Sequence, residues 1–147
     1  KKTERIILLL RILHLIAESD QTKPVCTKDL PINYTTAETE RINDIYLYVL
    51  SHYSKPISLK EIARVAHLCP QSFCRYFKYK THKTFSQFLN EVRILNSCKL
   101  LVNSDFTITQ ICYKTGYNNI SHFNRQFKLI TGMTANQYKK KYTQEGL

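Results

Sequence analysis

Residue types that favour irregular or sheet-rich folds are scarce in this sequence. Its 147 residues include no tryptophan, one methionine, three glycines and four prolines. Few positions are therefore available for tight turns or for breaks in helices. No segment alternates apolar and polar residues as a half-buried strand does, whereas long segments repeat apolar residues at helical spacing. With 43% hydrophobic residues, enough to bury a core, this pattern argues against a β-rich fold and predicts the all-α class.

Paired cysteines are also lacking. The sequence has an odd number of cysteines, the five residues Cys26, Cys69, Cys74, Cys98 and Cys112. Of these, only Cys69 and Cys74 lie close together in the sequence. Neither a disulfide framework nor a zinc site is therefore indicated, and we expect no metal. Single cysteines within helices are usually small core residues, which is typical of a reduced, cytoplasmic protein.

No segment has the features of a membrane span or of a secretion signal. The most apolar run, residues 6–16, contains Arg11 and His14. It is too short to cross a bilayer, and no small-residue cleavage site follows it. The sequence thus gives no indication of export.

Acidic residues are scarce after residue 44. The net charge is +11, but residues 1–44 hold seven basic and seven acidic residues, so residues 45–147 carry all of the excess, with fifteen basic residues against four acidic ones. Such one-sided charge is typical of a polyanion binder. A basic surface can also coat an anionic membrane, but that usually requires exposed lipid-inserting side chains. The phenylalanines here are assigned to the core, so we expect no membrane contact.

The stretch 107–128, TITQICYKTGYNNISHFNRQFK, predicts a helix-turn-helix. Thr107 is suited to cap the first helix, and Gly116 supplies the positive φ that ends it. Asn118 or Asn119 can cap a second helix. That helix carries one apolar stripe at helical spacing, formed by Phe123, Phe127 and Ile130.

A second copy of this unit precedes it, SLKEIARVAHLCPQSFCRYFK at residues 58–78. The two copies align with an offset of 49 before the turn and 50 after it, which is evidence for an internal repeat. Phe73 then matches Phe123, and Arg75 matches Arg125. The repeat predicts helix-turn-helix units at about 58–80 and 107–130. One alternative is a duplicated packing module in which these arginines are ordinary solvated charges.

Each second helix places polar side chains opposite its phenylalanines. At 100° per residue the outward stripe contains Gln71, Cys74, Arg75 and Lys78 in the first unit, and Ser121, Asn124, Arg125 and Lys128 in the second. Hydrogen-bonding groups on such a face can meet base edges in the major groove. We expect phosphate contacts from both lysines, one turn further along, and from Ser58, Thr107 and His82.

A connecting helix at about 84–102, capped by Thr84, separates the two units. We expect its apolar residues to contact both of them: Phe88, Leu89, Val92, Leu95, Cys98 and Leu101. At ~1.5 Å per residue it is roughly 27 Å long, a strut of the right order to place two recognition helices one turn of B-DNA, ~34 Å, apart. His67 and His82 stand where the second unit has Gly116 and Gly132. Histidine tolerates positive φ less well than glycine, so we expect a strained or adjusted helix end there.

The N-terminal third has a different organisation. Residues 4–18 predict a helix that is apolar on two faces, within a segment 1–20 that we interpret as the end of a missing sensor or dimerisation domain. Packing on the helices downstream is the alternative. Residues 21–35 contain two prolines and predict a linker. A helix is predicted from Thr36 to about Ser54, at the start of the DNA-binding domain, residues 36–147. Its apolar face consists of Ile42, Ile45, Tyr46, Val49 and Leu50.

These features together resemble the DNA-binding region of AraC/XylS-type transcription regulators over residues 36–142. The resemblance is carried by ICYKTGYNNISHFNRQFKLITGMT at residues 111–134 and by SFCRYFKYKTHKTFSQFLNEVRI from Ser72. It implies sequence-specific binding of double-stranded DNA, without a cofactor, and regulation of transcription. It also implies base contacts from Gln71, Cys74, Arg75, Ser121, Asn124 and Arg125. Expected further partners are RNA polymerase and, through the N-terminal helix or an upstream domain, a second copy of the chain.

Two other classes of function are alternatives to sequence-specific DNA binding. An enzyme with His67 and Cys69 or Cys74 as a thiol site has no evident acid partner, so we expect no enzymatic activity. A sequence-blind architectural DNA-binding protein would also need a high positive charge. The two outward stripes differ in composition, which favours the reading of bases over the architectural alternative.

Overall fold

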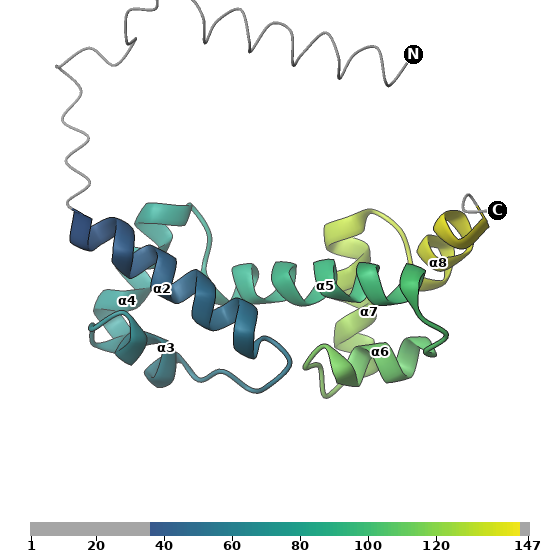
Figure 1. Cartoon of the computed structure of the whole chain (residues 1–147), viewed down its shortest axis with the longest axis horizontal. Helices are drawn as coiled ribbons and strands as arrows, with labels where there is room; N and C mark the ends of the chain where they lie inside the picture. The colour runs from purple at the N-terminus through teal and green to yellow at the C-terminus, as the bar shows by residue number, and fades with distance from the viewer. Residues whose placement is uncertain (1–35, 145–147) are drawn as a thin grey trace, which may run out of the picture. The chain divides into compact units, whose positions relative to one another are not determined.

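The structure is a computed structural model that describes residues 36–144, which fall within one unit of the chain, residues 35–147. These residues form seven helices and no strand (Figure 1): α2 (Thr36–His52), α3 (Leu59–Val65), α4 (Pro70–Thr81), α5 (Phe85–Asn103), α6 (Ile108–Lys114), α7 (Ile120–Thr131) and α8 (Ala135–Gln144). The predicted all-α class and both helix-turn-helix units are confirmed. The predicted N-terminal helix and linker, and Cys26, lie outside the described residues.

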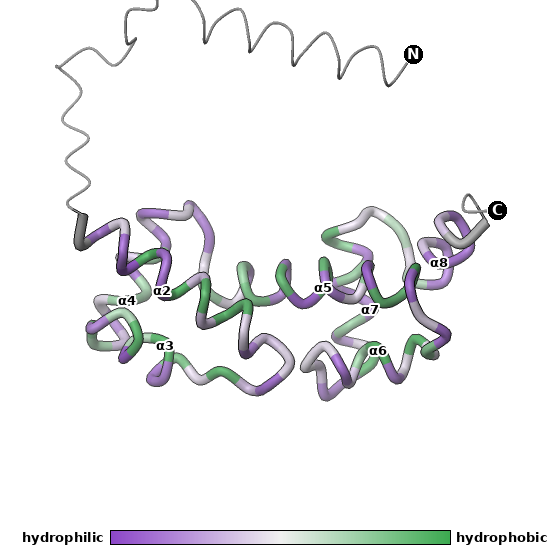
Figure 2. Tube along the Cα trace, viewed as in Figure 1, coloured by the Kyte–Doolittle hydropathy of each residue, from purple (hydrophilic) through white to green (hydrophobic). Residues whose placement is uncertain are grey.

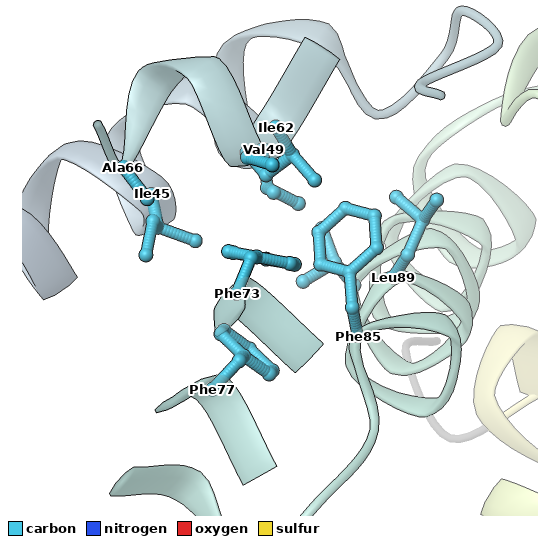
Figure 3. Packing of buried hydrophobic residues seen from close by; sticks show 10 residues of the cluster. Ile45, Val49, Ile62, Ala66, Phe73, Phe77, Phe85 and Leu89 are labelled. Atoms are coloured by element: carbon cyan, nitrogen blue, oxygen red, sulfur yellow. The ribbon is translucent and has the colours of Figure 1, made fainter. Parts of the chain in front are cut away.

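Helix α5 joins two groups of helices, each with its own core. Figure 1 shows α2, α3 and α4 at one end of α5 and α6, α7 and α8 at the other. We call the first group with the first half of α5 the first lobe, and the second group with the second half of α5 the second lobe. The buried hydrophobic residues of the first lobe are Ile45, Val49, Ile62, Ala63, Ala66, Phe73, Phe77, Phe85, Leu89 and Val92 (Figure 3). Those of the second are Ile94, Cys98, Leu101, Ile111, Cys112, Tyr117, Phe123, Phe127 and Ala135.

The two cores lie on opposite faces of α5. Phe85, Leu89 and Val92 follow one helical stripe, and Ile94, Cys98 and Leu101 follow another. Val92 and Ile94 are two residues apart, which corresponds to a rotation of about 200°. The prediction that Leu95 contacts the core is therefore wrong. Leu95 is 59% exposed, because the inward direction in the second lobe is the one that Ile94 takes.

Helix α2 also differs in detail from the prediction. It ends at His52 rather than near Ser54. Ile45 and Val49, four residues apart, point into the core, and Leu50 lies a further ~100° round the helix. Leu50 is 55% exposed, so its assignment to the apolar face was wrong.

Four helices begin with the same pair of hydrogen bonds. In each, a hydroxyl accepts from the backbone N–H three residues later, and the side chain of that later residue accepts from the backbone N–H of the cap. The pairs are Ser58 with Glu61, Thr84 with Gln87, Thr107 with Gln110, and Thr134 with Gln137. Such caps stabilise a helix by about 0.5–2 kcal/mol. The predicted caps Ser58, Thr84 and Thr107 are confirmed.

Helix α8 closes the second lobe. It is mostly hydrophilic in Figure 2 and meets the core through Ala135 and Tyr138. The ring of Tyr138 stands edge-on to Phe127, with ring centroids 5.6 Å apart. Lys139 Nζ donates to the carbonyl oxygen of Phe106 at 3.1 Å. These contacts attach α8 to α7 and to the loop between α5 and α6.

Candidate nucleic-acid interface

Helix α4 presents one apolar and one polar face. Cys69 is the N-cap residue, and Pro70 occupies the first turn, where its missing N–H has little cost. Phe73 and Phe77 are fully buried, and their rings lie 5.6 Å apart. All four residues of the predicted polar stripe are exposed: Gln71, Cys74, Arg75 and Lys78. Packing of the phenylalanines therefore fixes the direction in which this stripe points.

Helix α7 repeats this arrangement. The Asn119 side chain caps it by accepting from the N–H groups of Ser121 and His122, at 2.8 and 3.1 Å. Phe123 and Phe127 are fully buried. The exposed residues again include the whole predicted stripe: Ser121, Asn124, Arg125 and Lys128. Residues 71–80 and 121–130 show the same order of buried, half-buried and exposed side chains. The two helices therefore expose side chains at equivalent positions.

The structure adds two exposed residues that the sequence reasoning missed. Tyr79 and Leu129 occupy equivalent positions, one turn beyond Arg75 and Arg125, and each is 75% exposed. Each follows the second phenylalanine of its helix by two residues, so it points away from the buried stripe. This spacing could have predicted the exposure of both side chains from the sequence. Exposed apolar side chains beside an arginine in the major groove can contact thymine methyl groups.

Neither recognition helix carries an acidic residue. Two cations of the first lobe are paired with acids elsewhere: Lys80 with Glu38 at 2.9 Å, and Lys83 with Glu91 at 2.7 Å. Both carboxylates lie outside α4 and α7, so the exposed faces of these helices stay positively charged. This is the electrostatic condition for approach to a phosphate backbone.

The hydroxyl groups of Ser58 and Thr107 take part in the helix caps described above. Thr107 Oγ1 also donates to Gln110 Oε1 at 3.2 Å. In α3 the corresponding side chain is the carboxylate of Glu61, and hydrogen bonds from the Tyr48 hydroxyl and then the Ser58 N–H lower its pKa. The N-terminus of α3 therefore carries a negative charge that α6 lacks, which makes the start of α6 the better of the two for a phosphate.

The two histidines that replace glycine have positive φ. His67 has φ of 53° and its counterpart Gly116 has 86°, and His82 has 57° where Gly132 has 77°. The predicted left-handed helix ends are thus confirmed for both units. His82 is exposed at the C-terminal end of α4.

The cysteines fall into two classes. Cys98 and Cys112 are buried, as expected of single cysteines within helices, and Cys74 is exposed, as predicted for the outward stripe. Cys69 is also exposed, at the N-cap of α4, so the general expectation of a core cysteine was wrong there. The Cys69 Sγ and Ser72 Oγ atoms lie 3.2 Å apart, and hydrogen bonding from the Ser72 side chain and backbone to the sulfur lowers the pKa of the Cys69 thiol. In residues 36–144 no three His, Cys, Asp or Glu side chains come together as a metal site would require. None of the helices described above is long and apolar enough to cross a membrane.

Comparison with known proteins agrees with this geometry. A family model described as a helix-turn-helix domain matches residues 62–141. YdeC of Bacillus subtilis (strain 168), an uncharacterised HTH-type transcriptional regulator, is 31% identical over 103 residues, 70% of this chain and 35% of YdeC. The HTH-type transcriptional activator RhaS of Klebsiella pneumoniae (strain 342) is 26% identical over 124 residues, 84% of this chain and 41% of RhaS. The chain thus spans less than half the length of these relatives.

A solved structure shows the same fold. The DNA-binding domain of the global transcriptional factor AdpA, in complex with a target DNA, matches with a TM-score of 0.68 at 20% identity, over 72% of this chain and 96% of that one. The family model matches residues 62–141, and the solved structure shares the arrangement of two helix-turn-helix units on one connecting helix. The chain belongs to the AraC-type family of helix-turn-helix domains.

Proposed function

We propose that this protein binds double-stranded DNA sequence-specifically and regulates transcription, with α4 and α7 reading successive segments of the major groove. The observation that carries this proposal is the repeated placement of one exposed arginine, Arg75 and Arg125, on two helices with the same pattern of burial. The neighbours of these arginines differ between the two helices. Equivalent scaffolds with different side chains suit the reading of two different base sequences.

The exposed side chains suggest particular contacts. Arginine pairs best with guanine, and glutamine and asparagine with adenine, so we assign these roles to Arg75, Arg125, Gln71 and Asn124. Ser121 can hydrogen-bond several base edges, and the small Cys74 thiol suits a close approach to a base. These six residues are the proposed base contacts.

Phosphate contacts are proposed from residues at the margins of the same faces. Lys78 and Lys128 lie one turn from the arginines on exposed positions. Thr107 is favoured over Ser58, because the Glu61 carboxylate lies at the Ser58 end of α3. His82, exposed at the end of α4, completes this set.

The relatives suggest how such a domain is used. RhaS is named as a transcriptional activator, and we propose activation here, through contact with RNA polymerase. A second copy of the chain, bound through the N-terminal segment or a further domain, would add a second set of contacts and raise affinity through effective concentration. Because the proposed target is chromosomal DNA, we also propose that the protein acts in the bacterial cytoplasm.

Selection of bound duplexes from a random pool tests the proposal. The full chain should enrich two short conserved motifs about one helical turn apart. Affinity for the selected site should exceed that for unrelated DNA by about 10³-fold or more. A ratio near one would contradict base reading and support the sequence-blind architectural alternative, which the charge excess alone would explain.

A further inference from the structure

One side chain in the middle of α5 connects the two lobes. Arg93 Nε donates to the carbonyl oxygen of Tyr53 at 2.8 Å, and Nη2 donates to that of Lys55 at 3.0 Å. Both carbonyls belong to the loop between α2 and α3, in the first lobe. The guanidinium carbon also lies 5.6 Å from the ring centre of Tyr117, in the turn between α6 and α7 of the second lobe.

The same turn approaches the α2–α3 loop directly. A Cβ atom placed on Gly116 would lie 2.6 Å from the Tyr53 carbonyl oxygen and 3.0 Å from the backbone of Ser54. Only glycine leaves room for this approach. The carbonyl oxygen of Tyr53 thus lies against the turn of the second lobe and also accepts a hydrogen bond from Arg93.

Two further hydrogen bonds attach this turn to α5. The Tyr117 hydroxyl donates to Asn90 Oδ1 at 3.0 Å, and burial raises the pKa of Tyr117 to about 12. Ser97 Oγ donates to Thr115 Oγ1 at 3.1 Å, and both residues are fully buried. The turn is therefore fixed to the connecting helix on either side of Arg93.

The α5 residues of this cluster share one flank of the helix. Asn90, Arg93 and Ser97 are three and four residues apart, which places them on a single stripe. That stripe lies between the face that packs on the first core and the opposite face that packs on the second. Arg93 is therefore at the place where both lobes can be reached from α5.

Direct packing between the lobes is otherwise slight. Within the described part of the chain, α3 packs on α2 and α4, and both α2 and α4 pack on α5. In the second lobe, α6, α7 and α8 all pack on α5, and α7 also packs on α6 and α8. No helix of the first group packs on a helix of the second group by more than a marginal contact. The α2–α3 loop, the α6–α7 turn and Arg93 between them thus connect the lobes on this flank of α5.

We propose that Arg93 is a positioning residue that fixes the orientation of α4 relative to α7 and thereby sets the spacing between the two DNA segments that they read. This inference rests on the proposed function. Arginine suits the task because its planar fork bonds two carbonyls at once while its face lies over an aromatic ring. A lysine at this position has a single ammonium group and cannot hold both carbonyls and the ring in the same way.

The test measures tolerance to spacing. Duplexes carry the selected site with zero, one or two base pairs added or one removed between its two segments, and dissociation constants of the full chain are measured by fluorescence anisotropy. The variants are Arg93→Ala and Arg93→Lys. The matched control is Lys99→Ala, which removes the same charge from an exposed position on α5.

Wild type and Lys99→Ala should prefer one spacing by about tenfold or more over either neighbour. Arg93→Ala should bring all spacings within about threefold of one another, while its affinity for a duplex with only one segment stays within twofold of wild type. Arg93→Lys should give an intermediate profile. If Arg93→Ala does not fold by circular dichroism, the folded Arg93→Lys variant provides the result.

Two outcomes would overturn the inference, and they are distinguishable. A folded Arg93 variant with the wild-type spacing profile would show that α5 alone sets the geometry. A flat profile for the wild type itself would instead contradict the proposed function, because two rigidly linked recognition helices require a preferred spacing.

Discussion

The glycines that follow α6 and α7, Gly116 and Gly132, give a sharp test of the packing, because both have positive φ and their surroundings differ. Gly116 has φ of +86° and would clash with Tyr53 and Ser54 if it carried a Cβ, whereas Gly132 has φ of +77° and no atom within 4 Å of the added carbon. Gly132→Ala should therefore lower the free energy of unfolding only by the strain of a left-handed backbone at alanine, about 1–2 kcal/mol. Gly116→Ala adds a contact that forces backbone apart, typically about 1–3 kcal/mol more.

Urea and thermal unfolding of the two variants measure this difference. For a domain of this size a loss of 1 kcal/mol lowers Tm by about 4 °C. Gly132→Ala should then lower Tm by roughly 4–8 °C, and Gly116→Ala by roughly 8–20 °C. Equal losses for the two variants would mean that the turn of the second helix-turn-helix does not meet the α2–α3 loop as described.

Three further predictions concern DNA binding and the left-handed helix ends. Arg75→Ala and Arg125→Ala should each cost about 1–3 kcal/mol on the selected site and relax preference at different base pairs, ~10 apart; equal weakening on every sequence would make both arginines phosphate contacts instead. Lys78→Ala and Lys128→Ala should each lower the magnitude of the negative slope of log K against log salt concentration by about 1, and an unchanged slope would contradict the phosphate assignment. His82→Gly should remove backbone strain and stabilise the fold by up to ~1 kcal/mol in urea unfolding, while weakening DNA binding; a less stable variant would argue against strain at this position.

The features that sequence could predict are those with a short period. Phe73 and Phe77, four residues apart, determine which way α4 faces, and Phe123 and Phe127 do the same for α7. Once these directions are known, the exposed arginines follow from the 100° step of the helix. The caps were equally local, because a hydroxyl and a glutamate or glutamine three residues later form the same bonds wherever they occur.

The features that escaped prediction depend on contacts between distant residues. Leu95 looked like a core residue because the apolar pattern of α5 was treated as one stripe, whereas it is two stripes with a half-turn between them. No pattern in the sequence marks Arg93 as a link between the lobes, because the backbone carbonyls that it binds belong to residues 40 and 38 positions away in the chain. Whether the stripe residues touch bases is not a property of the fold alone, so those assignments stay predictions.

The half-turn between the two stripes of α5 makes its middle intolerant of changes in length. One residue inserted between Val92 and Ile94 would turn the second lobe by about 100° relative to the first and advance it by about 1.5 Å. The faces that meet each core would survive, but the flank that carries Asn90 and Ser97 would be divided between two directions. Residues added after Asn103, in the loop before α6, would leave this phase untouched. Insertions and deletions in relatives of this chain should therefore gather at the ends of α5 and spare its centre.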